Sequence, residues 1–113
     1  MKYFTAIYMM PIAKLEEWAK TPEAERKAEE EKYRKEWAMW LSAHSANIKN
    51  TIGLGKTKRV DKDGVSDVKN GFMLSSYVEA PSHEAAAEIF KGHPHLKLPG
   101  ATIEVMEVNQ MGG

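Results

Sequence analysis

The sequence predicts an α+β domain of the ferredoxin-like type, a four-stranded antiparallel sheet with helices on one face, and three observations lead to it. Segments with strand and helix patterns follow one another as strand, helix pair, strand, strand, helix, strand. Right-handed crossovers arrange this order into such a sheet. The chain of 113 residues contains no repeat and no linker long enough to divide it. We therefore predict one domain over residues 1–113.

The first strand is predicted over residues 3–10, an aromatic, β-branched and Met-rich segment that Pro11 ends. Both alternating sets of its side chains are largely apolar: Tyr3, Ile7 and Met9 on one side, and Phe4, Ala6, Tyr8 and Met10 on the other. A strand that is apolar on both sides is covered on both faces. Helices of the same chain can cover one face. For the other we expect a second copy, and hence a homodimer through the sheet face with a small hollow beneath the helices.

A helix pair follows. A short helix is predicted over residues 13–20, and a long one begins with Thr21 as N-cap and Pro22 at its first position and runs to about residue 46. The first part of the long helix is almost all charged, which is typical of a solvated face. Its length of roughly 36 Å at 1.5 Å per residue exceeds the width of a small domain, so we expect this charged half to overhang.

Turn residues place the later elements. Residues 47–55 are interpreted as a turn-rich link, residues 56–60 as the second strand, and residues 61–64 as a turn. The third strand is predicted over residues 72–79 after the Asn-Gly pair at 70 and 71.

The last helix is predicted from its N-cap, Ser82, to Phe90, and Gly92 ends it while Pro94 and Pro99 prevent its continuation. The closing strand is predicted over residues 102–108, and residues 109–113 are expected to be a frayed tail.

Composition excludes several classes of function. Lys and Arg number 16 and so do Asp and Glu, so no net charge attracts the chain to nucleic acid or to an anionic membrane. There is no cysteine, which excludes thiolate chemistry and suits a reducing cytoplasm. No stretch approaches the ~20 apolar residues that span a bilayer. We expect a cytoplasmic protein without a nucleic-acid or membrane partner.

With these elements in order, the sequence resembles the YCII-related (DGPF-type) family of the dimeric α/β-barrel superfamily. The resemblance covers nearly the whole chain and rests on the first strand and on these motifs: Trp37-x-x-Trp40, the turn at 50–55, Asp63-Gly64 before Gly71-Phe72, and His93-Pro94-His95-Leu96 followed by Pro99-Gly100 and Ile103-Glu104-Val105. It implies a homodimer with its sheets packed face to face and a small pocket in each subunit. A few relatives are lyases that act on small aromatic ring compounds.

Two family features are missing from this chain. Many members carry a His in the long helix and an Asp in the following turn, whereas the helix here reads Lys35-Glu36-Trp37-Ala38. The Asp-Gly-Pro-Phe signature is reduced to Asp-Gly-Val-Ser at residues 63–66. We therefore do not transfer that acid/base pair to this chain.

His93 and His95 are the candidate catalytic residues. Held at a helix-to-strand junction, an imidazole that titrates near neutrality can move a proton or bind an anionic or phenolic ligand. The alternative is that both rings cap the carbonyl groups of the preceding helix. Two His residues around a proline give at most two metal ligands, so we expect no metal site, and we expect no cofactor.

The candidate pocket residues are mostly aromatic: Tyr8, Trp37, Trp40, Leu41, His44, Phe72 and Glu104. An aromatic stripe on a helix is more often core, but a groove lined by indoles with a His nearby suits a flat aromatic ligand. Glu104 is either a carboxylate of raised pKa on an apolar sheet face or a charged residue at the rim.

These patterns support two hypotheses. The first is a small-molecule-binding protein that acts as a cofactor-free lyase or isomerase on a small aromatic or ring compound. The second is a non-catalytic structural or regulatory homodimeric module. Histidines that face a cavity bounded by the indoles favour the first, and histidines that only bind carbonyl groups beside a filled groove favour the second.

Overall fold

The computed structural model describes residues 1–109 and 111. The elements follow one another as β1 (Lys2–Met9), α1 (Ile12–Ala19), α2 (Glu23–Ala43), β2 (Ile48–Gly53), β3 (Thr57–Asp61), β4 (Gly64–Val68), β5 (Phe72–Ala80), α3 (His83–Ile89), the 3₁₀ helix η1 (Pro94–Lys97) and β6 (Thr102–Glu107). Four strands form an antiparallel sheet in the order β2-β5-β1-β6. This strand order confirms the predicted ferredoxin-like α+β fold.

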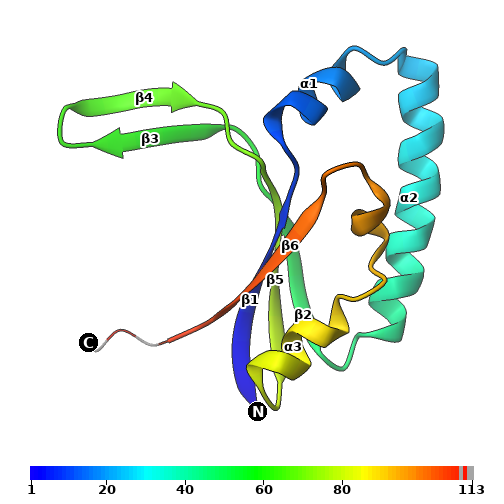
Figure 1. Cartoon of the computed structure of the whole chain (residues 1–113), viewed down its shortest axis with the longest axis vertical. Helices are drawn as coiled ribbons and strands as arrows, with labels where there is room; N and C mark the ends of the chain where they lie inside the picture. Colours follow the sequence, from blue (N-terminus) through cyan, green and yellow to red (C-terminus); the bar gives the residue numbers. More distant parts are fainter. Residues whose placement is uncertain (110, 112–113) are drawn as a thin grey trace.

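The sheet has one covered face and one uncovered face. Helices α2 and α3 lie on one side of the sheet, and the β3–β4 hairpin projects away on the other side (Figure 1). We refer to the sheet face toward the helices as the closed face and to the opposite one as the open face. Among the residues that the structure describes, no helix is both long and apolar enough to cross a bilayer.

Alternation along β1 explains the two faces. Phe4, Ala6 and Tyr8 are buried on the closed face, where they pair with Val78, Ser76 and Leu74 of β5. The core is built from these residues and from apolar side chains of α2, α3 and β2: Trp40, Ile48, Ala86 and Phe90. The open face keeps exposed apolar side chains from all four strands: Tyr3, Ile52, Tyr77 and Met106.

The second strand of the sheet was predicted in the wrong place. Ile48–Gly53, interpreted as part of a turn-rich link, is β2 and pairs with β5, with Ile48 opposite Val78 and Thr51 opposite Ser76. The predicted strand at 56–60 is instead β3, which pairs only with β4 in a separate two-stranded hairpin. β2 is an edge strand with few side chains in the core, so its polar sequence carries little of the usual strand signal.

Local signals at the helix ends gave mixed results. Ser82 is the N-cap of α3 as predicted, because its side-chain oxygen accepts a hydrogen bond from the Ala85 amide (3.1 Å). Thr21 is not the N-cap of α2: Pro22 occupies that position, and the Thr21 hydroxyl donates to the Glu17 carbonyl oxygen of α1 (3.4 Å). α2 ends at Ala43, earlier than expected. The predicted frayed tail at 109–113 falls largely outside the described residues.

The chain has a flat, extended shape and is less compact than a globular domain of its length. Its principal extents are 44 × 44 × 19 Å and its radius of gyration is 16.0 Å. A compact domain of this length has a radius of gyration of about 13 Å. The projecting hairpin contributes to the difference (Figure 1). A chain of this shape leaves much of its sheet without cover from its own helices.

Candidate functional site

A cavity of about 720 Å³ lies between α1, α2, η1 and the closed face of the sheet. We refer to it as the α1–α2 cavity. Apolar and aromatic side chains make up much of its wall: Leu15, Trp18, Tyr33, Trp37, Leu74 and Leu98. Glu29, Glu30 and Arg34 also line it, so the charged half of α2, which was expected to overhang, forms one wall of the cavity.

His95 is the titratable ring of η1 at this cavity. Its Nε2–H donates to the Met9 carbonyl oxygen at the end of β1 (3.0 Å). In a neutral imidazole only one nitrogen is protonated, so Nδ1 carries the lone pair. Burial lowers the pKa of His95, and hydrogen bonding to the backbone of Met9 and Thr102 opposes part of that effect. The ring is thus a neutral acceptor whose tautomer is set by the sheet.

His93 is held in the opposite tautomer. Its Nδ1 accepts a hydrogen bond from the His95 backbone N–H (2.9 Å), which leaves the proton of the neutral ring on Nε2. Burial, together with the nearby His95 and His44, lowers the pKa of His93 to about 4. Neither this ring nor that of His95 binds a carbonyl of α3 in the hydrogen bonds of the described residues. Side-chain capping of α3 is therefore not what these rings do.

Aromatic rings surround His93 behind the cavity wall. Ring centroids of Trp37 and Trp40 lie 4.4 and 4.3 Å from that of His93, and the Tyr8 ring lies at 5.2 Å. Of these rings only Trp37 lines the cavity. Tyr8 is core, and its hydroxyl forms a hydrogen bond with Ser76 (2.7 Å). Trp37 therefore lines the cavity and also contacts the buried ring of His93.

The other predicted pocket residues lie elsewhere. Leu41 packs against the core, and His44 stacks on Trp40 at 4.2 Å while its Nδ1–H donates to the Trp40 carbonyl oxygen (2.8 Å). Glu104 is exposed on the open face, opposite Ile7. The structure brings His95 and Trp37 to one cavity and does not bring Leu41, His44 or Glu104 to it.

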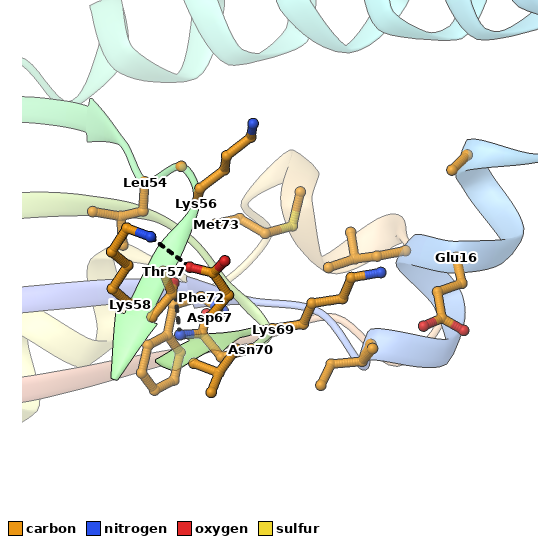
Figure 2. A pocket seen from close by; sticks show the side chains of 15 residues that line it. Glu16, Leu54, Lys56, Thr57, Lys58, Asp67, Lys69, Asn70, Phe72 and Met73 are labelled. Carbon is orange, nitrogen blue, oxygen red and sulfur yellow. Dashed lines mark hydrogen bonds and ion pairs between the residues drawn. The ribbon is translucent and has the colours of Figure 1, made fainter. Parts of the chain in front are cut away.

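Phe72 lines a second, larger concavity of about 1100 Å³ between α1 and the base of the hairpin. Figure 2 shows that its labelled side chains include the lysines at 56, 58 and 69 around apolar ones from β5. Lys58 is engaged by Asp67 at 2.6 Å, as Figure 2 also shows. Leu15 and Met73 line both cavities, so α1 separates the two.

Sequence reasoning missed several residues of the α1–α2 cavity. Leu15 and Trp18 lie within the helix predicted at 13–20, but nothing local shows that they line a cavity with Tyr33 and Leu74. Ser76, in the core and not at the cavity, is another omission: it is fully buried and binds the hydroxyls of both Tyr8 and Thr51 at 2.7 Å. Within the described residues, no three His, Asp or Glu side chains gather in a way that could hold a metal ion.

The comparisons with known proteins agree on the fold alone. No family model matches the chain, and no curated protein matches it in sequence. A solved structure with a TM-score of 0.55 is 5-chloro-2-hydroxyhydroquinone dehydrochlorinase (TftG) from Burkholderia phenoliruptrix AC1100 in complex with 2,5-dihydroxybenzoquinone. It is 13% identical, and the match covers 98% of this chain and 96% of that one. At this identity the likeness shows the fold alone, a four-stranded antiparallel sheet with helices on one face.

Proposed function

We propose that the chain is a small-molecule-binding protein whose site is the α1–α2 cavity and whose ligand is a small aromatic or ring compound. One observation carries this proposal: a neutral His95, with its lone pair on Nδ1, lines a cavity whose wall also includes Trp18, Tyr33 and Trp37. Apolar walls with a few fixed polar groups are the usual form of a ligand site. Flat rings pack on indole and phenol faces. The dehydrochlorinase, whose structure contains a ring compound, supports the same ligand class.

The reaction that suits this site is proton transfer without a cofactor, as in a lyase or an isomerase. A neutral imidazole within reach of an acidified C–H or O–H group accepts its proton and returns it at another position. The lowered pKa of His95 keeps the ring neutral near pH 7, so the base form is present. His95 would be the catalytic residue and Trp37 the wall that orients the ring.

We further propose that the protein is a cytoplasmic homodimer formed through the open face, in the manner of the YCII-related family. Exposed apolar side chains lie on all four strands of that face, and β1 contributes Tyr3, Ile7 and Met9 to it. Contiguous exposed apolar surface of this kind marks a partner site. The spread shape of the chain and its match to a dimeric fold class support a second copy as the partner.

A non-catalytic structural or regulatory dimer is the second candidate, and the hydrogen bonds of η1 favour it. His95 ties η1 to the end of β1, and His93 closes the turn that begins η1. If the two rings form only these hydrogen bonds, they hold the helix-to-strand connection on the sheet and bind no ligand.

Tryptophan fluorescence separates the two functions. Trp18 and Trp37, two of the three tryptophans, line the cavity. Titration with a panel of phenols and ring carboxylic acids should quench this emission saturably. The His95→Ala variant should weaken the binding of the hits, whereas His83→Ala, which changes an exposed ring on α3, should leave it unchanged. The absence of saturable quenching by any compound would favour the structural dimer.

A further inference from the structure

Two buried N–H groups beside the α1–α2 cavity have no acceptor within the described chain. They are Nε2 of His93 and Nε1 of Trp40, whose residues are 1% and 8% exposed. A buried polar group without a partner is destabilising, so native proteins keep few of them. The third such atom, Nε of Arg26, lies about three helical turns from Trp37 along α2. The pair at His93 and Trp40 therefore requires an explanation.

Both atoms are donors. The indole nitrogen of Trp40 can only donate, and Nε2 of His93 carries the ring proton because Nδ1 accepts from the His95 amide (2.9 Å). The two ring centroids are 4.3 Å apart. Because neither protonated nitrogen can accept, the two cannot form a conventional hydrogen bond with one another. The other rings around His93 are those of Tyr8, Trp37, Phe90 and His95, and none offers a carboxylate. The Tyr8 hydroxyl is bonded to Ser76.

We propose that Nε2–H of His93 and Nε1–H of Trp40 form a donor pair that binds the negatively charged oxygen of a ring ligand, a phenolate or an enolate. The inference rests on the proposed function and deepens it by naming the charge of the ligand. Trp37 lines the cavity and lies 4.4 Å from His93 between ring centroids, so its indole is the side chain that turns aside to admit the oxygen.

The donor pair complements His95. In the proton transfer proposed above, the pair of electrons left by the departing proton moves onto the ring oxygen, and Nδ1 of His95 takes the proton. Donors fixed in a dry environment where negative charge develops stabilise that state more than water does. Burial supports the assignment because the low pKa of His93 keeps its ring a neutral donor that holds its own proton.

The test uses 4-nitrophenolate, which carries the charged oxygen, and 4-nitroanisole, which has the same ring system and a methylated oxygen. We expect wild-type protein to bind the phenolate more tightly by about tenfold or more, as for hydrogen bonds to a charged group. Trp40→Phe removes one donor and keeps an aromatic ring, and it should lose most of that preference. His83→Ala is the control and should keep the preference, because its exposed ring on α3 lies outside both the cavity and the donor pair.

Each outcome decides the matter. Equal affinity for the two probes in the wild type, or an unchanged preference in Trp40→Phe, overturns the donor pair and leaves the ring-binding function standing. Binding of neither probe, together with no hit in the panel of phenols and ring acids, removes both proposals. If Trp40→Phe does not fold, the indole N–H resonance of Trp40 in ¹⁵N-labelled wild type gives the answer. It should move downfield with the phenolate and not with the anisole, and no movement overturns the inference.

Discussion

The two faces of one sheet differ in almost every physical respect. On the closed face, β1 contributes Phe4, Ala6 and Tyr8, all buried against α2, α3 and β5. On the open face the same strand contributes Tyr3 and Ile7 to a surface with no element of the described chain upon it (Figure 1). Apolar side chains lie on both faces, but the chain covers only one of them, which is why we propose that a second copy covers the other.

The α1–α2 cavity, which we propose as the ligand site, lies on the closed face, where polar groups are held in fixed states. The sheet sets the tautomer of His95 through Met9, and the amide of His95 sets that of His93. The open face has a large exposed surface and few polar groups that hydrogen bonds hold in one state. One face is therefore suited to recognising a small molecule and the other to recognising a second copy, and four changes test that division.

The largest effect is expected from a matched pair of phenylalanines. Phe4 is 1% exposed on the closed face and Phe72 is 48% exposed at the start of β5. Phe4→Ala should lower the free energy of unfolding by about 3–5 kcal/mol, because it leaves a cavity in the core. Phe72→Ala should cost about 1 kcal/mol or less. Urea denaturation followed by circular dichroism measures both, and equal losses would contradict the assignment of core and surface.

A charge on the open face tests the partner surface directly. Ile7→Asp puts a carboxylate between the neighbours Ser75 and Glu104 on that face. In a dimer, both copies bury the charge, so the dissociation constant should rise about 100-fold or more. Sedimentation equilibrium measures it. Met39→Asp, on an exposed position of α2, is the control and should change nothing. An Ile7→Asp protein that associates as the wild type does would exclude this face.

Acid should lower the free energy of unfolding, because it protonates the buried ring of His93. Burial holds the pKa of His93 at about 4 in the folded state, against 6.5 for an unperturbed ring, so the unfolded chain binds the proton more readily. The stabilisation is complete above pH 6.5 and is lost as pH falls toward 4. For a pKa that falls from 6.5 to about 4, this loss amounts to roughly 3 kcal/mol of unfolding free energy. The urea midpoint should therefore fall as the pH is lowered across this range, and this slope should be the same in the wild type and in the His83→Ala variant. A His93→Phe variant that kept the full slope would show that another group causes it.

The smallest effect concerns the hairpin. Val60 and Val65 pair at its tip and are 75% and 65% exposed. A two-stranded hairpin alone is marginally stable in water, and this one projects on the side of the open face (Figure 1). If the hairpin lies along the second copy, the double change Val60→Ser and Val65→Ser should raise the dissociation constant of the dimer about tenfold. The unfolding free energy of the monomer should change by no more than about 0.5 kcal/mol. An unchanged constant would place the hairpin in solvent.

Much of the fold could be predicted from local signals. Pro11 ends β1, Ser82 begins α3, and Gly92, with a φ of 76°, follows α3 in a conformation that favours glycine. β2 could not be predicted, because in this edge strand only Ile48 is buried, Ile52 is exposed, and the remaining positions carry polar or turn-forming residues. The second strand of the sheet was therefore predicted at residues 56–60, which belong to the β3–β4 hairpin.

The site was predictable only in part. The sequence placed His93 and His95 together at a helix-to-strand junction, where η1 now holds them. The two rings are both 1% exposed, but only that of His95 lines the cavity, while that of His93 packs against Trp37. That division depends on how α2 packs against η1, and no pattern within either segment encodes it. Glu104 was misplaced for the related reason that one strand presents alternate residues to opposite faces.

The most direct test of the account is the mass of the wild-type protein in solution, measured by light scattering on a size-exclusion column at micromolar concentration. An open face that requires a partner predicts twice the chain mass of 12.7 kDa. A well-behaved species with the mass of one chain would contradict it, because the exposed apolar side chains of all four strands would then be stable in water.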